Sequence, residues 1–196
     1  MTARLGLLIF FSILLIACVR PVLQPEDVVF SESKLPEKWL LEGRIGIQLP
    51  SQSWQAAIHW HQYGEDFEIS LRSPFGRVLR RIQKQDEDVV LVDGDGQTYY
   101  RSAGELDHLV SEQLGVPVPV SSLRYWILGQ PQPGRSWQLL DSAQGVAQGF
   151  SQEGWKIRFH GWSLFNERML PARLTLRRDA IKVRLVLHEW STAPVE

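Results

Sequence analysis

The chain has 196 residues, of which 44% are hydrophobic and eight are tryptophan, which is enough apolar material for a globular domain and excludes general disorder. Its 21 Lys and Arg nearly balance 22 Asp and Glu, and the formal net charge of −1 argues against a nucleic-acid partner. Cys18 is the single cysteine, so no internal disulfide forms and packing must hold the fold.

The chain begins with a short export signal that ends at this cysteine. Arg4 precedes an uncharged apolar run at 5–17, which is shorter than the roughly 18 apolar residues of a spanning helix. Leu15-Ile16-Ala17-Cys18 resembles a bacterial lipobox, in which the cysteine is acylated and becomes the new N-terminus. The alternative is an ordinary signal peptide with an incidental cysteine. We expect residues 1–17 to be a signal peptide of the lipoprotein type and the protein to work in the cell envelope.

A tether follows the cysteine. Residues 18–30 contain Pro21 and Pro25 and show no apolar periodicity, so we expect a lipid anchor and tether that let the domain stand off the membrane. Two or more acyl chains on Cys18 would make that anchoring stable. Residues 31–196 show no internal repeat and are expected to form one domain.

Alternating apolar and polar residues predict strands from residue 41 onward. Ile45 and Ile47 share one face of the first strand, while Arg44 and Gln48 share the other. The Asp-Gly pairs of residues 93–96 favour a tight hairpin, because Asp-Gly tolerates a positive φ. The strands predicted in the first half cover residues 41–49, 54–61, 67–72, 77–84, 89–92 and 97–101.

Two short helices are predicted in the middle of the chain. Ser102 and Glu105 form a capping box for the first helix, which ends at Gly115. Residues 116–119, Val-Pro-Val-Pro, cannot continue a helix and must run extended. The second helix covers 123–128 and is capped by Ser121 or Ser122.

Strands resume after the helices, and a further helix is expected at 28–38. The later strands cover residues 136–140, 145–151, 155–162, 172–178 and 181–190, with hairpin turns at 153–154 and 179–180. About eleven antiparallel strands with one apolar face form a curved sheet or partial barrel. The inserted helices are expected to cover its open concave side.

Chemistry-bearing motifs are few, and we expect no enzyme, no metal and no cofactor. His59 and His61 share a strand face and offer a pair of metal ligands, but a third ligand is not evident and solvated histidines are the simpler interpretation. Residues 93–96 resemble part of a calcium loop, yet a hairpin turn is favoured. A basic cluster is expected on the outward face of a strand, with contact to anionic head groups as the weaker alternative: Arg77, Arg80, Arg81 and Lys84.

One loop carries an apolar residue at its tip. Pro74, Phe75 and Gly76 join two strands, and Phe75 has no neighbour from its own sheet to cover it. It either packs onto the rim of the sheet or serves as an exposed probe for a membrane or a lipid. The helical residues Leu123, Trp126 and Ile127 pose a similar choice between plain core and a lid over a ligand cavity.

The chain resembles the LolB family of outer-membrane lipoprotein receptors of proteobacteria. Residues 116–131, VPVPVSSLRYWILGQP, are close to a family pattern of the form (M/V)P(I/V)P…SLR.WILG.P. Residues 73–76, Ser-Pro-Phe-Gly, look like the family's N-P-L-G loop, and residues 90–93 and 96–99 resemble the stretch that follows it.

The resemblance implies a fold, a role and a location. The fold is a mainly β, incomplete antiparallel β-barrel with inserted helices as a lid over an apolar cavity. The implied role is to accept lipoproteins from the periplasmic carrier LolA, shelter their acyl chains and insert them into the outer membrane. The family's membrane-insertion leucine carries over to Phe75, which keeps its size and hydrophobicity. Val19 fits the family rule that sends lipoproteins to the outer membrane, where Cys18 would anchor the protein on the periplasmic face.

The resemblance and the alternation together predict a cavity lining. The partners are then LolA, acylated lipoprotein cargo and outer-membrane lipids, and we expect a monomer. The alternatives are an envelope lipid-binding sensor or scaffold that does not release cargo, and an envelope hydrolase. The expected floor residues are Ile45, Ile47, Ile58, Trp60, Ile69 and Leu71, and the expected lid residues are Leu106, Val110, Leu123, Trp126 and Ile127.

Overall fold

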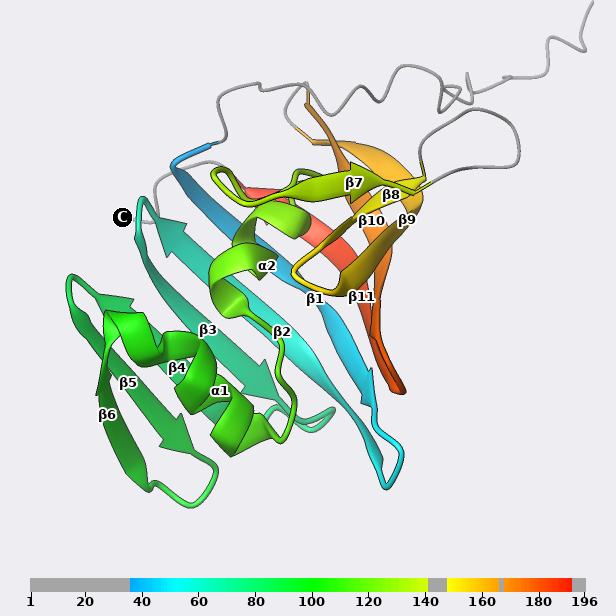
Figure 1. The fold of residues 1–196 in the computed structure, drawn as a ribbon. Coiled ribbons are helices and arrows are strands. Elements are labelled where there is room, and N and C mark those ends of the chain that lie inside the picture. The colour runs from blue at the N-terminus through cyan, green and yellow to red at the C-terminus, as the bar shows by residue number, and fades with distance from the viewer. Residues whose placement is uncertain (1–35, 141–147, 166–167, 192–196) are drawn as a thin grey trace, which may run out of the picture.

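The computed structural model describes residues 36–140, 148–165 and 168–191, which form eleven strands and three short helical segments (Figure 1). In chain order these are β1 (Lys38–Gln48), β2 (Ser53–Tyr63), β3 (Asp66–Arg72), β4 (Val78–Gln85), β5 (Asp88–Asp93), β6 (Thr98–Ser102), η2 (Ala103–Glu105), α1 (Leu106–Leu114), α2 (Val120–Trp126), β7 (Trp137–Leu139), β8 (Gly149–Gln152), β9 (Trp155–Phe165), β10 (Arg168–Arg178) and β11 (Ile181–Ser191).

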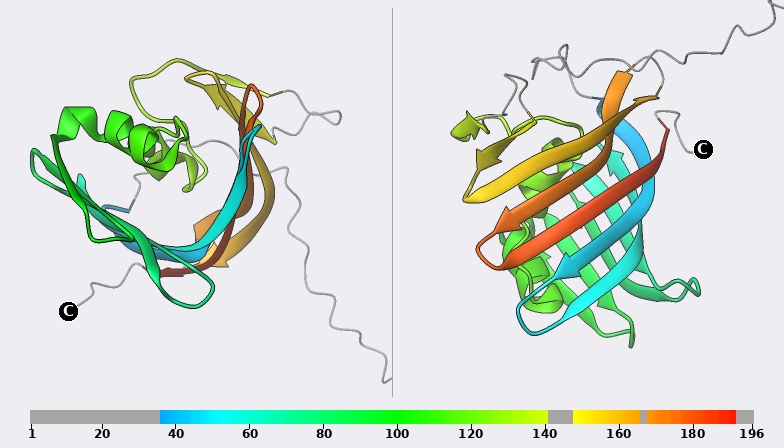
Figure 2. Two further views of the ribbon diagram at one scale, coloured as in Figure 1. Left: turned by 90° about the horizontal axis from the view of Figure 1, so that it is seen from below. Right: turned by 90° about the vertical axis from the view of Figure 1, so that its right-hand side faces the viewer.

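All eleven strands belong to one antiparallel sheet. Its order is β6-β5-β4-β3-β2-β1-β11-β10-β9-β8-β7. Strands that pair in the sheet are consecutive in the chain, except for the pair β1–β11, which joins the half formed by β1–β6 to the half formed by β7–β11. β6 and β7 are the two edges and do not pair with each other, so the barrel is not closed. The sheet curves around α1 and α2 (Figure 2). The predicted incomplete antiparallel barrel with two inserted helices is confirmed.

The junction between the two halves contains a β-bulge. The register of β1 against β11 shifts between Glu42 and Gly43. A Cβ atom at residue 43 would lie 2.5 Å from the carbonyl oxygen of Val186, so only glycine allows the strands to approach this closely.

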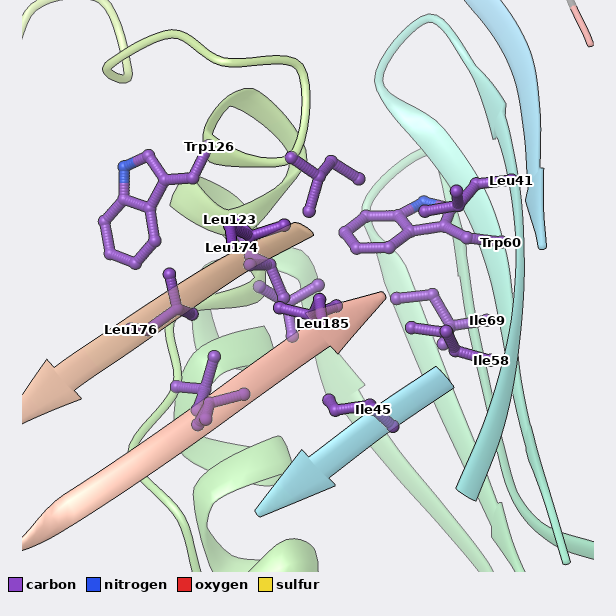
Figure 3. Close-up of a cluster of buried hydrophobic side chains, with 14 of the residues drawn as sticks. Leu41, Ile45, Ile58, Trp60, Ile69, Leu123, Trp126, Leu174, Leu176 and Leu185 are labelled. Carbon is purple, nitrogen blue, oxygen red and sulfur yellow. The ribbon is translucent and has the colours of Figure 1, made fainter. Parts of the chain in front are cut away.

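The core fills the space between the sheet and the helices. Apolar residues at alternate positions of β1, β2, β3, β5, β9, β10 and β11 point inward and are buried, as the period-two pattern predicts, whereas the edge strands β6 and β7 contribute no buried side chain. Each such side chain contributes about 1.5–3 kcal/mol when it is fully buried. Figure 3 shows part of this cluster, in which Ile58 and Trp60 of β2 point across the core toward Leu123 of α2 and toward Leu174 and Leu185 of β10 and β11.

The first helical segment begins as predicted, and the second does not. The Glu105 carboxylate accepts hydrogen bonds from the Ser102 hydroxyl (2.8 Å) and the Ser102 backbone N–H (3.4 Å). The prediction that Ser121 or Ser122 caps the second helix is wrong, because α2 begins at Val120 with Pro119 at the N-cap. Asp107 of α1 supplies the missing acceptor instead, since its carboxylate accepts the Ser121 N–H (3.1 Å) and the Ser121 hydroxyl.

Two other boundaries differ from the prediction. Of the helix predicted at 28–38, residues 28–35 lie outside the described residues, and residues 36–38 are not helical because β1 begins at Lys38. Of the strand predicted at 145–151, residues 145–147 lie outside the described residues, and β8 begins at Gly149.

Candidate functional site

The residues predicted to line the interior all lie in the buried core, and each has at most 6% of its surface exposed. The sheet contributes its part from β1, β2 and β3, and the lid contributes from α1, α2 and the residue after α2. They are Ile45, Ile47, Ile58, Trp60, Ile69, Leu71, Leu106, Val110, Leu123, Trp126 and Ile127.

In this conformation the lid is closed on the sheet. Trp60, Trp126 and Ile127 each have 0% exposed surface, so no water-sized void adjoins them. The protein's own side chains therefore fill the space around these residues at ordinary packing density. An acyl-chain cavity here stays a prediction, and it requires α1 and α2 to move away from the sheet.

The predicted floor covers only half of the actual interior. β8, β9, β10 and β11 contribute an equally apolar wall, which includes Phe150, Ile157, Leu174, Leu176 and Leu185. The signal was present in the sequence, because apolar residues alternate along 155–159 and 181–187. Figure 3 shows Leu174, Leu176 and Leu185 in the same cluster as the predicted residues.

A buried glutamine fastens the end of the lid to the sheet. Gln152 of β8 is 2% exposed, and its Oε1 accepts the Trp126 Nε1–H and the Gln132 backbone N–H, both at 2.8 Å. Its Nε2 donates to the backbone carbonyl oxygens of Gln132 (3.0 Å) and Arg135 (3.3 Å). We call Gln152, Trp126 and Gln132 the Gln152 latch. Sequence reasoning missed it.

The serine beside the latch adds a second polar link. The Ser122 side chain is fully buried, and its hydroxyl lies 2.5 Å from both Gln132 Oε1 and Glu153 Oε2. A hydroxyl has one proton, so it donates to one of these two oxygens. Donation to Glu153 links α2 to the turn between β8 and β9, and donation to Gln132 links it to the loop that follows α2.

A second contact between the lid and the sheet is an ion pair, which is weaker and more exposed than the Gln152 latch. Arg124 Nη2 lies 2.7 Å from Glu65 Oε2 in the β2–β3 turn and donates to the Tyr125 hydroxyl (2.8 Å). Glu65 is largely exposed, and such pairs contribute about 0–1 kcal/mol. A pocket of about 140 Å³ lies here, lined in part by Trp39 and Leu128. That volume is below the roughly 300 Å³ at which ligand pockets begin.

The β3–β4 hairpin carries Phe75 into solvent. Phe75 is 97% exposed, so the alternative that it packs onto the rim of the sheet is wrong. The Ser73 carbonyl oxygen accepts the Gly76 N–H (2.9 Å), and Gly76 has φ +82°, a conformation that favours glycine. Both views in Figure 2 show this hairpin projecting away from the side of the sheet that the helices cover.

The two histidines and the Asp-Gly turn, which were considered as metal-binding alternatives, each have partners within the protein. His59 Nδ1 lies 3.3 Å from Glu42 Oε1, and His61 Nδ1 lies 3.4 Å from the Tyr63 hydroxyl. No group of three His, Cys, Asp or Glu side chains within the described ranges is placed to hold a metal. Asp93 Oδ1 accepts the backbone N–H groups of two turn residues at 2.9 and 3.0 Å, which is a hairpin arrangement.

The predicted basic cluster does not form one outward face. Arg80 lies on the inner side of β4 with Ile82, because it is opposite Leu71 of β3. Arg81 is outward and lies 3.6 Å from Glu68, while Lys84 lies 3.1 Å from Asp66.

Within the part of the chain that the structure covers, no helix is long and apolar enough to cross a membrane.

An open antiparallel sheet curved around two short helices, with an apolar interior between them, defines a class of lidded half-barrels. A solved LolA superfamily protein from Nitrosomonas europaea shares this fold, with a TM-score of 0.54, 11% identity, and coverage of 83% of this chain and 90% of that chain. At that identity the likeness shows the fold alone.

Sequence comparisons then identify the family. The profile described as "Outer membrane lipoprotein LolB" matches residues 37–190. The outer-membrane lipoprotein LolB of Alkalilimnicola ehrlichii is 34% identical over 157 residues, 80% of this chain and 78% of the relative. That of Halorhodospira halophila is 31% identical over 186 residues, 92% of this chain and 91% of the relative.

The chain therefore belongs to the LolB family. It is an outer-membrane lipoprotein of the periplasmic face, and it receives lipoproteins from LolA for insertion into the outer membrane. Its role is lipoprotein localisation and not enzymatic catalysis.

Proposed function

We propose that the protein carries acyl chains between its lid and its sheet and releases them into the outer membrane with the help of Phe75. The apolar interior between α2 and the sheet, closed by a small number of hydrogen bonds, is the observation that supports this proposal. The predicted lining residues are its walls, and an arriving chain would replace contacts that the closed lid makes with them.

The acyl chains must stay out of contact with water during transfer. Each methylene group kept from water contributes about 0.8 kcal/mol, so a whole acyl chain resists entering water by something on the order of 10 kcal/mol. Transfer that uses no nucleotide therefore requires each acceptor to bind the chains more tightly than the donor does: this interior more tightly than the carrier, and the bilayer more tightly than this interior. A lid that exchanges its own side chains for acyl chains keeps the apolar surface covered throughout.

Phe75 acts at the exit step. A fully buried phenylalanine side chain contributes about 1.5–3 kcal/mol, so entry of Phe75 into the bilayer strengthens membrane contact roughly 10- to 150-fold. Phe75→Glu should take cargo from LolA normally and deliver it slowly to liposomes, whereas Phe75→Leu should deliver like the native chain. The fold should be unaffected because the side chain is 97% exposed. Normal delivery by Phe75→Glu would remove Phe75 from the mechanism.

The remaining parts of the proposal concern the anchor and the assembly state. Residues 1–17 are the signal peptide, acylated Cys18 anchors the chain, residues 18–30 are the tether, and residues 31–196 are the binding domain. The domain works as a monomer, because one sheet and its lid contain the whole proposed interior.

Photo-crosslinking tests the interior directly. A photoreactive phenylalanine analogue replaces Trp126 or Leu123, both inside the lid, or Tyr100, which is 69% exposed on β6 and serves as the control. After loading from LolA, the interior positions should crosslink to the acyl chains of the cargo, and position 100 should not. Bound cargo without an interior crosslink would contradict the proposal. Crosslinking without later release to liposomes would instead describe a lipid-binding scaffold.

A further inference from the structure

Seven cations lie on the outer face of four adjacent strands of the sheet, β1, β11, β10 and β9. These residues alternate with buried ones in β1, β9, β10 and β11, so their side chains lie on the side away from the helices. We call them the basic face: Arg44, Lys156, Arg158, Arg173, Arg177, Lys182 and Arg184. None forms an ion pair with a carboxylate of the described residues.

The strand register places these cations side by side. Arg177 is opposite Lys182 on one neighbour and Lys156 on the other. In the next row, Thr175 lies between Arg184 and Arg158. Adjacent strands are about 4.8 Å apart, so several positive charges lie within one Debye length of about 8–10 Å.

The titration of two groups reflects this crowding. Burial lowers the pKa of His160, and the charges of Arg158 and Arg173 among the neighbouring cations lower it further. The pKa of Lys182 is also lowered, first by burial and then by neighbouring arginines. Uncompensated positive charge of this kind favours an anionic partner.

The charges are segregated along the strands. Glu42 and Glu189, which are opposite each other in β1 and β11, lie toward the end where β1 begins. The basic face lies toward the other end, which also carries the β10–β11 turn and the hairpin of Phe75. Two carboxylates at that end, Glu153 and Asp179, are in hairpin turns.

A row of outward residues links the basic face to the Phe75 hairpin. Arg44 is opposite Ala57 of β2, and Ala57 is opposite Arg72 of β3. Two strand spacings amount to about 10 Å, so a further cation stands between the basic face and the loop that begins at Ser73. The exposed apolar tip and the cations thus occupy one end of the same outer surface.

We infer that the basic face docks on the anionic phosphates of membrane lipid headgroups and so orients the protein with Phe75 toward the bilayer. The inference rests on the proposed function, in which Phe75 enters the membrane. An apolar anchor beside a cationic patch is the combination that interfacial membrane binding uses. The chain is an outer-membrane lipoprotein, so a lipid surface is always near. A carrier docked here would face the side away from the lid helices and could not pass chains beneath them.

Vesicle binding tests the inference. Residues 18–196 with Cys18→Ala, which lack the apolar signal peptide, are mixed with phosphatidylglycerol–phosphatidylethanolamine vesicles or with neutral phosphatidylcholine–phosphatidylethanolamine vesicles, at low and high salt. Each Lys or Arg near an anionic leaflet strengthens binding about fivefold. Lys182→Gln with Arg184→Gln should therefore weaken binding to the anionic vesicles about 25-fold and reduce its salt dependence. The control, Lys38→Gln with Arg101→Gln, removes the same charge elsewhere and should change binding less than twofold.

The outcomes separate this inference from the proposed function. Equal binding by the test and control pairs, or equal binding of the native chain to neutral vesicles, would overturn the docking surface. Loss of LolA binding by the test pair with vesicle binding unchanged would make the face a carrier site and also overturn it. Cargo uptake from LolA, measured without vesicles, should be normal in both pairs. Failure of uptake in the native chain would overturn the proposed function and leave the vesicle result to be judged on its own.

Discussion

The Gln152 latch makes the lid testable with one substitution. Gln152→Leu keeps the size of a side chain that is 2% exposed but removes its acceptor and its donor. In the closed lid, the Trp126 Nε1–H and the N–H and carbonyl oxygen of Gln132 would then lack their partners. Water satisfies these groups once the lid opens.

The size of the effect follows from that difference. Each buried polar group without a partner costs about 1–3 kcal/mol. The added apolar surface of leucine offsets part of this cost, so the closed state should lose about 3 kcal/mol relative to the open state. This corresponds to a shift of about 150-fold in the lid equilibrium.

Hydrogen exchange of α2 amides, followed by mass spectrometry, measures the lid equilibrium. Exchange in Gln152→Leu should accelerate in α2 while the central strands β1, β2 and β11 stay protected, and uptake of cargo from LolA should become faster. Gln138→Leu, at an exposed position of β7, is the matched control. If exchange rose equally in α2 and in the central strands, the hydrogen bonds would hold the whole fold together, and the separate lid would be refuted.

Three further predictions concern the anchor, the helix pair and pH. The chain with Cys18→Ala should still take acylated cargo from LolA in solution, because the interior lies in the domain; loss of uptake would place binding at the anchor. Asp107→Ala removes the acceptor for the Ser121 N–H and should lower stability by about 1 kcal/mol, or roughly 2–4 °C in Tm, and an unchanged Tm would show that water replaces it. Because the pKa of His160 is lowered from 6.5, the unfolded chain binds its proton at higher pH, so stability should fall as the pH drops below about 6.5. His160→Gln should reduce that fall between about pH 7 and pH 5 in urea titrations; an identical slope would exclude His160 as its source.

Alternation along the chain was sufficient to predict most of the fold. A strand shows its buried face in every second residue, so the inward positions of β1, β2 and β3 follow directly from the sequence. The same alternation marks the inward residues of β9 and β11, which belong to the interior as well. The prediction that Arg80 faces outward is wrong because charge by itself does not indicate exposure, and Arg80, two residues before the buried Ile82, shares its inward face.

The latch could not have been predicted in the same way. Gln152 bonds to Trp126 across 26 residues of sequence, and no local pattern specifies which distant group a side chain meets. Its only signal is position, since Gln152 follows Phe150 at an inward site of a short strand. The start of α2 was missed for a related reason, because its acceptor comes from a neighbouring helix and not from its own first turn.

The unpaired edges β6 and β7 have a mechanical consequence. In a closed barrel, the girth is fixed by the number of strands and their stagger, and widening it would break a ladder of hydrogen bonds. Here the edge strands β6 and β7 can move apart while every strand keeps its hydrogen-bonded neighbours. If acyl chains enter the interior as proposed, the sheet can adjust its width to chains of different number and length, at the expense of contacts that α1 and α2 make with it.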